Sequence, residues 1–369
     1  MKSPVAPPLS QTVRVSQTVR GSWTVPEPNA SGIPSSRSPS DTAQPPASLQ
    51  RRLKNQAKRG LRRLFEWGQR VGVDILPRHF YSEVPDIRTL RQDCAWRAPR
   101  SMVGVHGTAI DSQFEFVASC CFGPEGIQSQ LASGAIYRDA CDDNGEPGFS
   151  ATDAEFLHAF IRSIRPRRVI QIGCGVSTAV MLRAAHASGY VLEIRCIEPY
   201  PTPFLIEAHR RGELELVAKP AQTVSLETLT DLGDYGLLFV DSTHTVKPGS
   251  EVNRLILEAL PRLRPGTWVH FHDIYFPYDY QRGLLDDELF FCNETALLLA
   301  FLTGNDSYRI RASLSMLHHA DAARLAQCLP RYTPAPCEQG LRTGPGDFPA
   351  SIYLEVIERT EAGLNCDIP

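Results

Sequence analysis

The sequence predicts an α/β protein built on a doubly wound, seven-stranded, mostly parallel sheet. From about Thr152 onward, short apolar runs alternate with segments whose apolar residues recur at helical spacing. Four of the apolar runs end in glycine, carboxylate or imidazole: VIQIGCGVST, CIEPYP, FVDSTH and WVHFHDIYFP. Strands that are apolar throughout lie in the middle of a parallel sheet, with helices on both faces. The polar groups that follow them therefore predict a ligand site at the carboxyl ends of the strands.

The alternation predicts five β/α units followed by two further strands. A helix over 153–164 is expected to precede the first strand. The expected strands are 167–173, 191–198, 214–219, 235–241, 266–273, 307–317 and 351–358. The expected helices between them are 177–187, 203–212, 225–232, 249–263 and 293–302, the last beginning at a capping Asn293.

Composition divides the rest of the chain. Residues 1–48 are rich in Pro, Ser and Thr and bury too little apolar surface to offset their chain entropy, so we expect disorder. Residues 49–150 are expected to form a basic helix and an accessory or lid segment. The main domain is expected over 151–358, with a Pro- and Cys-rich excursion at 320–349, and a C-terminal tail at 359–369.

The basic segment 51–70 has two interpretations. It interleaves lysines and arginines with Leu53, Leu61, Leu64, Phe65 and Trp67. It is either a surface helix that meets acidic partners or lipid head groups, or a helix that packs its apolar stripe on the main domain. Charge runs usually mark solvated faces, which favours the second interpretation.

The composition of the 369 residues excludes several classes of protein. A net charge of -3 indicates neither nucleic-acid nor membrane binding as the main function. No apolar run approaches the roughly 20 residues that span a bilayer, and the N-terminus lacks the apolar core of a secretory signal. The ten cysteines contain no C-x-x-C pair. A reduced, cytoplasmic protein is therefore expected.

A glycine pair follows the first strand of the main domain. Gly173 and Gly175 form a G-x-G directly before a helix, where the backbone must turn tightly and approach a ligand. Glu198 closes the next strand 23 positions after Gly175, where a carboxylate can accept ribose hydroxyls. The third glycine of a dinucleotide fingerprint would fall at Thr178 and is missing. A nucleoside ligand without phosphate tolerates Ser177 and Thr178 there, which favours S-adenosylmethionine over NAD.

Two further strand ends carry groups suited to catalysis. Asp241 and His244 follow the fourth strand, and His272 and Asp273 follow the fifth. Ends of adjacent strands lie about 4.8 Å apart, so these groups can converge. Asp241, His272 and Asp273 make a plausible divalent-cation site, and a pKa near 6.5 would suit His244 to accept a proton. The alternative is that the aspartates cap turns while the histidines pack; two pairs beside a nucleoside site favour function.

Taken together, these motifs resemble the class I S-adenosylmethionine-dependent methyltransferases. The similarity is greatest to a subgroup with IEPYP after strand two, D-S-[ST]-H after strand four and HFHDI-x-F-P-x-D-Y after strand five. Here these stand at Ile197–Pro201, Asp241–His244 and His270–Tyr280. CNETALLLAFL and ILPRHFYSEVPD resemble further segments of the subgroup, and the match spans about Ile75 to Val356. The resemblance implies the Rossmann-like methyltransferase fold.

The resemblance also implies roles for individual residues. The cofactor-binding candidates are Gln171, Gly173, Cys174, Gly175, Ser177, Glu198 and Asp241, with the glycines and Cys174 along the methionine part and Glu198 on the ribose. Related sugar O-methyltransferases bind Mg²⁺ at positions matching Asp241, His272 and Asp273. One carboxylate of that set is His272 here, and Gln171 stands where the class usually has an acid.

We therefore expect an S-adenosylmethionine-dependent methyltransferase that acts on a hydroxyl oxygen of a small polar acceptor, such as a sugar or secondary metabolite. His244 would remove the proton, while Asp241, His272 and Asp273 would orient the acceptor, with or without Mg²⁺. Two rival functions stay open: other chemistry on the same fold, as in hydroxylase-like proteins, and a non-catalytic binding protein, for which Gln171 is the motivating residue. A homo-oligomer also stays open, and no nucleic-acid partner is expected.

Overall fold

The computed structural model describes residues 49–358 except 77, 80, 94, 286–289, 338–339 and 345. The segment expected to be disordered, 1–48, and the expected C-terminal tail, 359–369, lie outside the described residues. The chain divides into two compact units, Met1–Phe80 and Tyr81–Pro369. Among the described residues, no helix combines the length and apolar character needed to cross a membrane.

The described part of the first unit contains one long helix, α1 (Leu49–Arg70), in the segment where a basic helix was expected. Its C-terminal turn is closed by two backbone bonds. The Gly72 N–H donates to the Gln69 carbonyl at 3.2 Å, and the Val73 N–H donates to the Gly68 carbonyl at 2.9 Å. Gly72 has a φ of 79°, the left-handed conformation that this type of helix end requires.

The second unit is built on the predicted sheet. In the described part of the chain it has seven strands in the order β3-β2-β1-β4-β5-β9-β6. Strands β1 to β5 pair in parallel, and β9 pairs antiparallel with both β5 and β6. The strands are β1 (Arg168–Ile172), β2 (Glu193–Ile197), β3 (Glu215–Val217), β4 (Leu237–Val240), β5 (Trp268–Phe271), β6 (Tyr308–Ser313) and β9 (Ile352–Val356). The predicted fold class is therefore confirmed.

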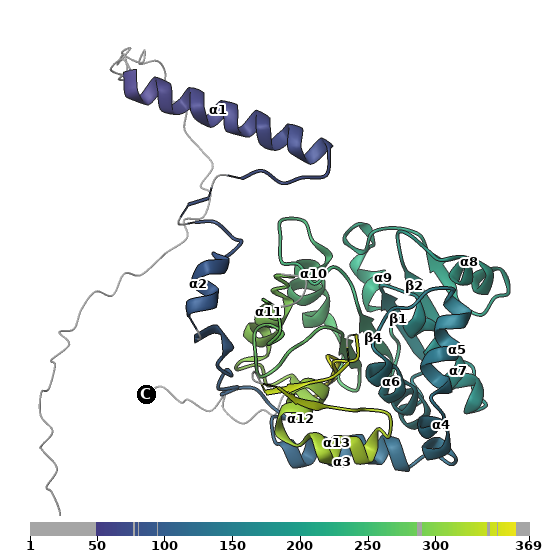
Figure 1. Ribbon diagram of the computed structural model, residues 1–369. Helices are drawn as coiled ribbons and strands as arrows, with labels where there is room; N and C mark the ends of the chain where they lie inside the picture. Colours follow the sequence, from purple (N-terminus) through teal and green to yellow (C-terminus); the bar gives the residue numbers. More distant parts are fainter. Residues whose placement is uncertain are drawn as a thin grey trace, which may run out of the picture. The chain divides into compact units, whose positions relative to one another are not determined.

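Residues along the central strands alternate between two cores. In β4, Leu237 and Phe239 pack into one core, and Leu238 and Val240 into the other. The first core includes residues of α3 (Ile110–Phe122), α4 (Ile127–Ser133), α5 (Ala135–Asn144), α6 (Ala151–Ile164), α7 (Val176–Ala187) and α8 (Pro203–Arg210). The second includes residues of α9 (Leu226–Thr230), α10 (Glu251–Arg254) and α11 (Glu294–Leu302), which lie on the opposite face of the sheet (Figure 1). Both faces are covered, as buried parallel strands require.

Short elements complete this unit. Helices α3 to α5, from the segment expected to be accessory, belong to the same compact unit as the sheet. Helix α10 continues as a π-helical turn and a 3-10 turn. The short elements are α2 (Ile87–Gln92), η1 (Ala95–Arg97), η2 (Ala221–Thr223), η3 (Leu255–Ala259), η4 (Leu260–Arg262), α12 (Leu314–Ala320), α13 (Ala322–Cys328) and the hairpin β7 (Ala335–Cys337) and β8 (Gly340–Arg342).

Two expectations about elements were wrong. The strand expected over 307–317 ends at Ser313, whose side chain accepts a bond from the Met316 N–H and begins helix α12. Asn293 does not cap α11 with its side chain. Its Oδ1 instead accepts a bond from the Val246 N–H at 2.7 Å, which fastens the loop after β4 to the start of α11.

Candidate active site

The predicted strand ends meet at one edge of the sheet. Strand β4 lies between β1 and β5, and the backbone pairing continues past the strand ends. The Asp241 N–H donates to the Ile172 carbonyl at 2.9 Å, and the His272 N–H donates to the Val240 carbonyl at 3.0 Å. The polar residues after β1, β4 and β5 are therefore neighbours, as expected for adjacent parallel strands.

Gly173 is required by the packing of two strand ends. Its φ is 75°, and a Cβ at this position would lie 1.6 Å from the carbonyl oxygen of Asp241. No side chain fits in that space, so the turn after β1 can approach the end of β4 only with glycine. Gly175, in contrast, is extended, and its N–H donates to the Thr178 hydroxyl at 3.1 Å.

Gln171 is placed inside the glycine turn rather than toward a ligand. It is fully buried on β1. Its amide nitrogen donates to the Gly173 carbonyl at 3.0 Å and to the Ser177 hydroxyl at 2.9 Å, and its amide oxygen accepts from Thr178 at 2.9 Å. A carboxylate could not donate the first two bonds. Gln171 and Ser177, both predicted to touch the cofactor, thus brace the turn between β1 and α7.

Glu198 lies beside the same turn. One carboxylate oxygen accepts a bond from the Cys174 N–H at 3.2 Å, and the other accepts from the Tyr200 N–H at 2.9 Å. The side chain is partly exposed, and each carboxylate oxygen has a further lone pair. Glu198 is therefore oriented by the backbone and can still accept hydroxyl donors.

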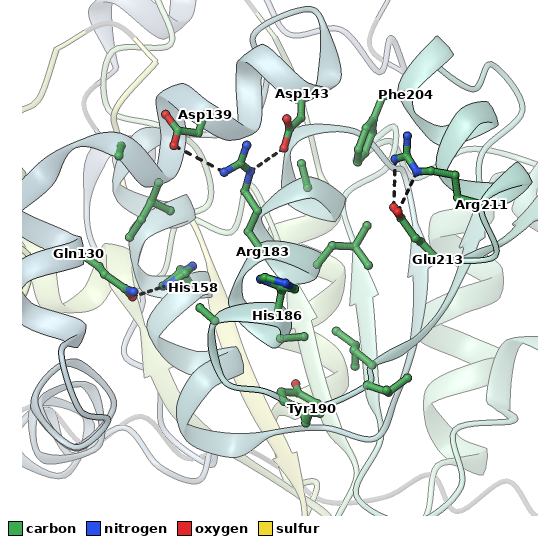
Figure 2. Close-up of a pocket in the computed structure, with 18 of the residues that line it drawn as sticks. Gln130, Asp139, Asp143, His158, Arg183, His186, Tyr190, Phe204, Arg211 and Glu213 are labelled. Carbon is green, nitrogen blue, oxygen red and sulfur yellow. Dashed lines mark hydrogen bonds and ion pairs between the residues drawn. The ribbon is translucent and has the colours of Figure 1, made fainter.

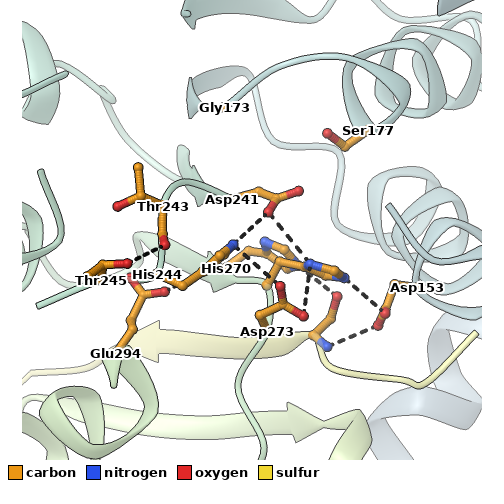
Figure 3. Close-up of polar contacts among 12 residues, drawn as sticks. Asp153, Gly173, Ser177, Asp241, Thr243, His244, Thr245, His270, Asp273 and Glu294 are labelled. Atoms are coloured by element: carbon orange, nitrogen blue, oxygen red, sulfur yellow. Dashed lines mark hydrogen bonds and ion pairs between the residues drawn. The ribbon is translucent and has the colours of Figure 1, made fainter. Parts of the chain in front are cut away.

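The four predicted catalytic residues form one cluster, of which Asp241, His244 and Asp273 are labelled in Figure 3. His244 Nε2 lies 3.4 Å from Asp241 Oδ1 and 3.4 Å from Asp273 Oδ2. His272 Nδ1 lies 3.6 Å from Asp241 Oδ1 and 3.7 Å from Asp273 Oδ1. The carboxylates are partly exposed, whereas both imidazoles are buried. Each carboxylate thus faces both imidazoles, and the two carboxylates form the open side of the cluster.

Two buried carboxylates contact the ring nitrogens of the histidines that face away from Asp241 and Asp273. Glu294, the first residue of α11, lies with its Oε2 2.8 Å from His244 Nδ1. Asp153, in the first turn of α6, lies with its Oδ2 3.2 Å from His272 Nε2. Asp153 also accepts bonds from Ser150 and from the backbone N–H groups of Ala350 and Ser351. Each imidazole therefore has a carboxylate on both of its ring nitrogens.

These contacts determine the protonation of the cluster. Burial opposes the charged form of His244, but Asp241, Glu294 and Asp273 outweigh it and raise the pKa of His244 to about 10. Burial also opposes charge on His272, yet Asp273 and Asp241 raise its pKa well above 6.5. The two imidazoles in turn hold the pKa of Asp241 well below its usual range, against the effect of burial. The carboxylates therefore move the pKa of His244 far from the unperturbed value of 6.5.

The donor set does not fit the expected divalent cation. A histidine ligand must offer a neutral nitrogen to the metal, but His272 turns both nitrogens toward carboxylates. Asp241 and Asp273 are already compensated by the two imidazoles. Within the described ranges, no group of three or more His, Cys, Asp or Glu side chains is arranged to hold a metal ion. The imidazoles supply the positive charge that a cation would bring.

The backbone at the cluster is strained. His244 has a φ of 56° and Asp273 a φ of 57°, in the left-handed region that non-glycine residues rarely adopt. The loop that carries His244 is fixed by contacts at His244 and at the residue before it. The Thr243 N–H and hydroxyl donate to Glu251 at 3.0 and 2.6 Å, and the Glu294 N–H donates to the His244 carbonyl at 3.3 Å. Strain of this kind gathers at functional sites.

Three residues of this region were missed by the sequence analysis. Asp153 and Glu294 were treated only as parts of helices, and Tyr275, whose hydroxyl donates to Asp273 at 3.0 Å, only as part of a motif. An acid in the first turn of an apolar helix usually serves the helix dipole. Asp153 and Glu294 also have a second role, contact with a histidine, which only the structure shows.

His270, two residues before His272, has a structural role. Its ring stacks on Phe239 with centroids 4.0 Å apart, and its Nε2 lies 2.9 Å from the Ser351 hydroxyl. Burial lowers its pKa to about 3, so the ring is neutral. It packs in the core between β4 and β9.

A cavity of about 950 Å³ lies away from the strand ends, against α5, α7 and α8 (Figure 2). Its cations are already paired: Arg183 contacts Asp143 at 2.5 Å, and Arg211 contacts Glu213 at 2.8 Å. The polar residues at the carboxyl ends of β4 and β5, and the glycine turn after β1, do not line this cavity. The cluster at the sheet edge is therefore the better candidate for chemistry.

Comparison with known proteins supports the cluster at the sheet edge as the candidate site. A family model described as a methyltransferase domain matches residues 170–274. That range runs from β1 to the residue after Asp273 and includes Gly173, Glu198, Asp241 and His244. An uncharacterized protein of Archaeoglobus fulgidus is 32% identical over 181 residues, which cover 44% of this chain and 76% of that protein.

The chain is also similar to two solved structures. The SAH-bound methyltransferase PaMTH1 of Podospora anserina has a TM-score of 0.34 and 16% identity, over 64% of this chain and 89% of that one. The 1,6-didemethyltoxoflavin-N1-methyltransferase of Burkholderia thailandensis, with S-adenosylhomocysteine bound, has a TM-score of 0.27 and 16% identity, over 67% and 87%. Both TM-scores are low, so neither likeness bears on the chemistry of this chain.

Proposed function

The chain belongs to the class I S-adenosylmethionine-dependent methyltransferases, and from that premise we propose that it methylates a hydroxyl oxygen of a small polar acceptor, such as a sugar or secondary metabolite. One observation carries the proposal. His244 is backed by Glu294 and presents Nε2 between the carboxylates of Asp241 and Asp273. This is an arrangement for binding a hydroxyl group and removing its proton.

The turn after β1 suits the cofactor. When bound, S-adenosylmethionine supplies an electrophilic methyl group on a sulfonium sulfur. Gly173, Cys174 and Gly175 would line its methionine part, since these three residues are partly exposed and Gly173 lies against Asp241. Glu198 would accept the ribose hydroxyls with the lone pairs that Cys174 and Tyr200 leave free.

The cluster would bind the acceptor and accept its proton. Asp241 and Asp273 accept hydrogen bonds from acceptor hydroxyls and orient the reacting oxygen, and the charge of His272 helps to hold the pKa of Asp241 low. Bound S-adenosylmethionine would supply the methyl group to this oxygen, and Asp241 and Asp273 would hold the oxygen toward it. The hydroxyl proton passes to His244 Nε2. Most of the rate then comes from positioning.

The pKa of His244 gives this role a pH signature. Only the neutral imidazole can accept the proton, and at neutral pH His244 is largely protonated. We therefore expect kcat/KM to rise with pH from neutrality toward about 10. If kcat/KM does not change over this pH range, a carboxylate accepts the proton instead of His244.

Product mass tests the proposed reaction directly. The chain is incubated with S-adenosylmethionine and a panel of sugars and hydroxylated metabolites, and methylation adds one CH₂ to an acceptor. A chelator should leave the rate unchanged, because the histidines occupy the positions a metal would need. Addition of one oxygen would indicate the hydroxylase-like alternative. Failure to bind S-adenosylhomocysteine in calorimetry would overturn the proposed function.

His244→Ala should abolish turnover and leave cofactor binding intact. The residue contacts Asp241, Asp273 and Glu294 but not the glycine turn. General-base removal costs about 10²- to 10⁴-fold in rate. The matched control is His186→Ala, an exposed histidine at the end of α7, which should keep full activity. Full activity in the His244 variant would contradict the assigned role.

A further inference from the structure

The proposed reaction makes no use of helix α1, whose sequence is strongly basic. We propose that α1 binds the surface of an anionic phospholipid bilayer, lying parallel to it with its apolar face among the acyl chains. This proposal does not depend on the acceptor or on the catalytic cluster.

Among the described residues of its own unit, the apolar face of α1 is uncovered. Leu61, Leu64 and Trp67 recur at intervals of three residues, so they share one face of the helix. Their exposed fractions are 42%, 42% and 57%. A tryptophan has an apolar ring and a polar N–H, and it favours the boundary between head groups and acyl chains.

The rest of the helix surface is cationic. Over residues 56–70, five exposed side chains are positively charged: Lys58, Arg59, Arg62, Arg63 and Arg70. The one acid in that range, Glu66, pairs with Arg62 at 2.8 Å. The whole chain has a net charge of -3, so this positive charge is local to the helix. Long basic side chains can extend from a helix lying in the interface to reach lipid phosphates.

The chain after α1 extends the apolar surface. The turn at Gly72 brings Val73 back over Gly68. A Cβ added to Gly68 would lie 2.5 Å from the Val73 carbonyl oxygen and 3.3 Å from the Ile75 side chain. Val73 and Leu76 in this return are 52% and 67% exposed. The apolar area is thus broader than the helix face alone.

This pattern fits a bilayer better than other acidic partners. A nucleic acid would take the cations but would leave Leu61, Leu64 and Trp67 without an apolar contact. A bilayer surface provides anionic head groups and apolar chains within one layer. An amphipathic helix that is too polar to span a bilayer, with an apolar stripe on one side and basic residues on the other, is the type that lies in the interface.

Vesicle co-sedimentation of the full chain tests the proposal. The chain should sediment with phosphatidylcholine vesicles that contain phosphatidylserine, and not with phosphatidylcholine alone. Binding should weaken as salt rises from about 0.1 to about 0.5 M, because screening shortens the reach of the charges. No sedimentation with the anionic vesicles would overturn the proposal.

Two variants separate the apolar and charged contributions. Leu64→Ala with Trp67→Ala removes apolar area while favouring the helix, and it should lower vesicle partitioning about tenfold or more. Arg59→Gln with Arg63→Gln should reduce binding to the anionic vesicles and make it less sensitive to salt. The control is Val103→Ala with Val191→Ala, two exposed valines outside α1 that should bind like the unmodified chain.

Circular dichroism checks that each variant is folded. Unchanged vesicle binding in the Leu64/Trp67 variant would overturn the proposal. So would a loss of equal size in the control pair. Binding to a DNA duplex that is stronger than binding to vesicles, and that survives the Leu64/Trp67 change, would assign the helix to a polyanion instead.

Discussion

At the residue scale, the protonation of His244 depends on three carboxylates. Histidine alone titrates near 6.5, but Asp241, Glu294 and Asp273 stabilise the imidazolium and raise the pKa to about 10. Glu294 is the contact that orients the ring, because it is fully buried and lies 2.8 Å from Nδ1. The strength of His244 as a base is therefore set by Asp241, next to it in the loop after β4, together with Glu294 on helix α11 and Asp273 after β5.

Glu294→Gln should shift the pH dependence of methyl transfer to lower pH. Removing the negative charge lowers the pKa of His244, so its neutral form appears at lower pH, and the weaker base gives a lower limiting rate. The measurement is kcat/KM from pH 6 to about 10. Glu207→Gln, an exposed residue of α8, should leave the profile unchanged. An unshifted profile in the Glu294 variant would show that this carboxylate does not act through His244.

At the scale of elements, the turn after β1 is the tightest contact of the site. Gly173 touches the end of β4, and Gln171 fills the space beneath the turn with three hydrogen bonds. These hydrogen bonds give a structural reason why position 171 is a glutamine, whereas the class usually has an acid there. The hydrogen bonds of Gln171 therefore hold the turn in place without a bound ligand.

Gly173→Ala should cost about 3 kcal/mol or more of unfolding free energy. The new Cβ meets the Asp241 carbonyl oxygen at 1.6 Å, and the φ of 75° adds strain. Gly249→Ala is a matched control, with a φ of 76° and no atom within 4 Å of the added Cβ. It should cost about 1 kcal/mol, the strain alone. Chemical denaturation measures both, and equal losses would show that the close contact is unimportant.

At the scale of the whole molecule, the cluster connects parts of the chain that are distant in sequence. Asp153 of α6 joins His272 after β5 to the backbone of Ala350 and Ser351 before β9. Glu294 of α11 contacts His244 in the loop after β4. The two supporting carboxylates come from helices on opposite faces of the sheet, so the charges also hold the layers together.

The fold should lose stability as pH rises from 7 to about 10. The folded pKa of His244 is raised above its unfolded value of 6.5, so its contribution is complete below 6.5 and is lost as pH rises through about 10. The slope should reach about 1.4 kcal/mol per pH unit for this residue. The raised pKa of His272 acts in the same direction. Denaturation at several pH values measures the slope.

His244→Gln should reduce that slope, because the variant has no proton to lose in this range. His186→Gln is the control, since that histidine is exposed at the end of α7 and should leave the slope unchanged. A curve for the unmodified chain that is flat between pH 7 and 9 would contradict the assigned charge of the cluster.

The sequence alone determined the order of the seven strands of the sheet along the chain and one side of the site. Apolar strands that end in polar residues predict a parallel sheet, and neighbouring strand ends predicted that Gly173, Asp241, His244, His272 and Asp273 would meet. The ends of the elements were less predictable: the apolar run from β6 into α12 does not change character at Ser313.

Only the tertiary structure decided what supports that site. Asp153 and Glu294 lie on helices whose packing brings them to His272 and His244, and no local pattern in the sequence pairs them. The protonation of the histidines, the poor fit for a metal and the inward orientation of Gln171 all follow from those contacts. Local patterns determine strands and turns, whereas pKa values depend on every charge that folding brings within a few ångströms.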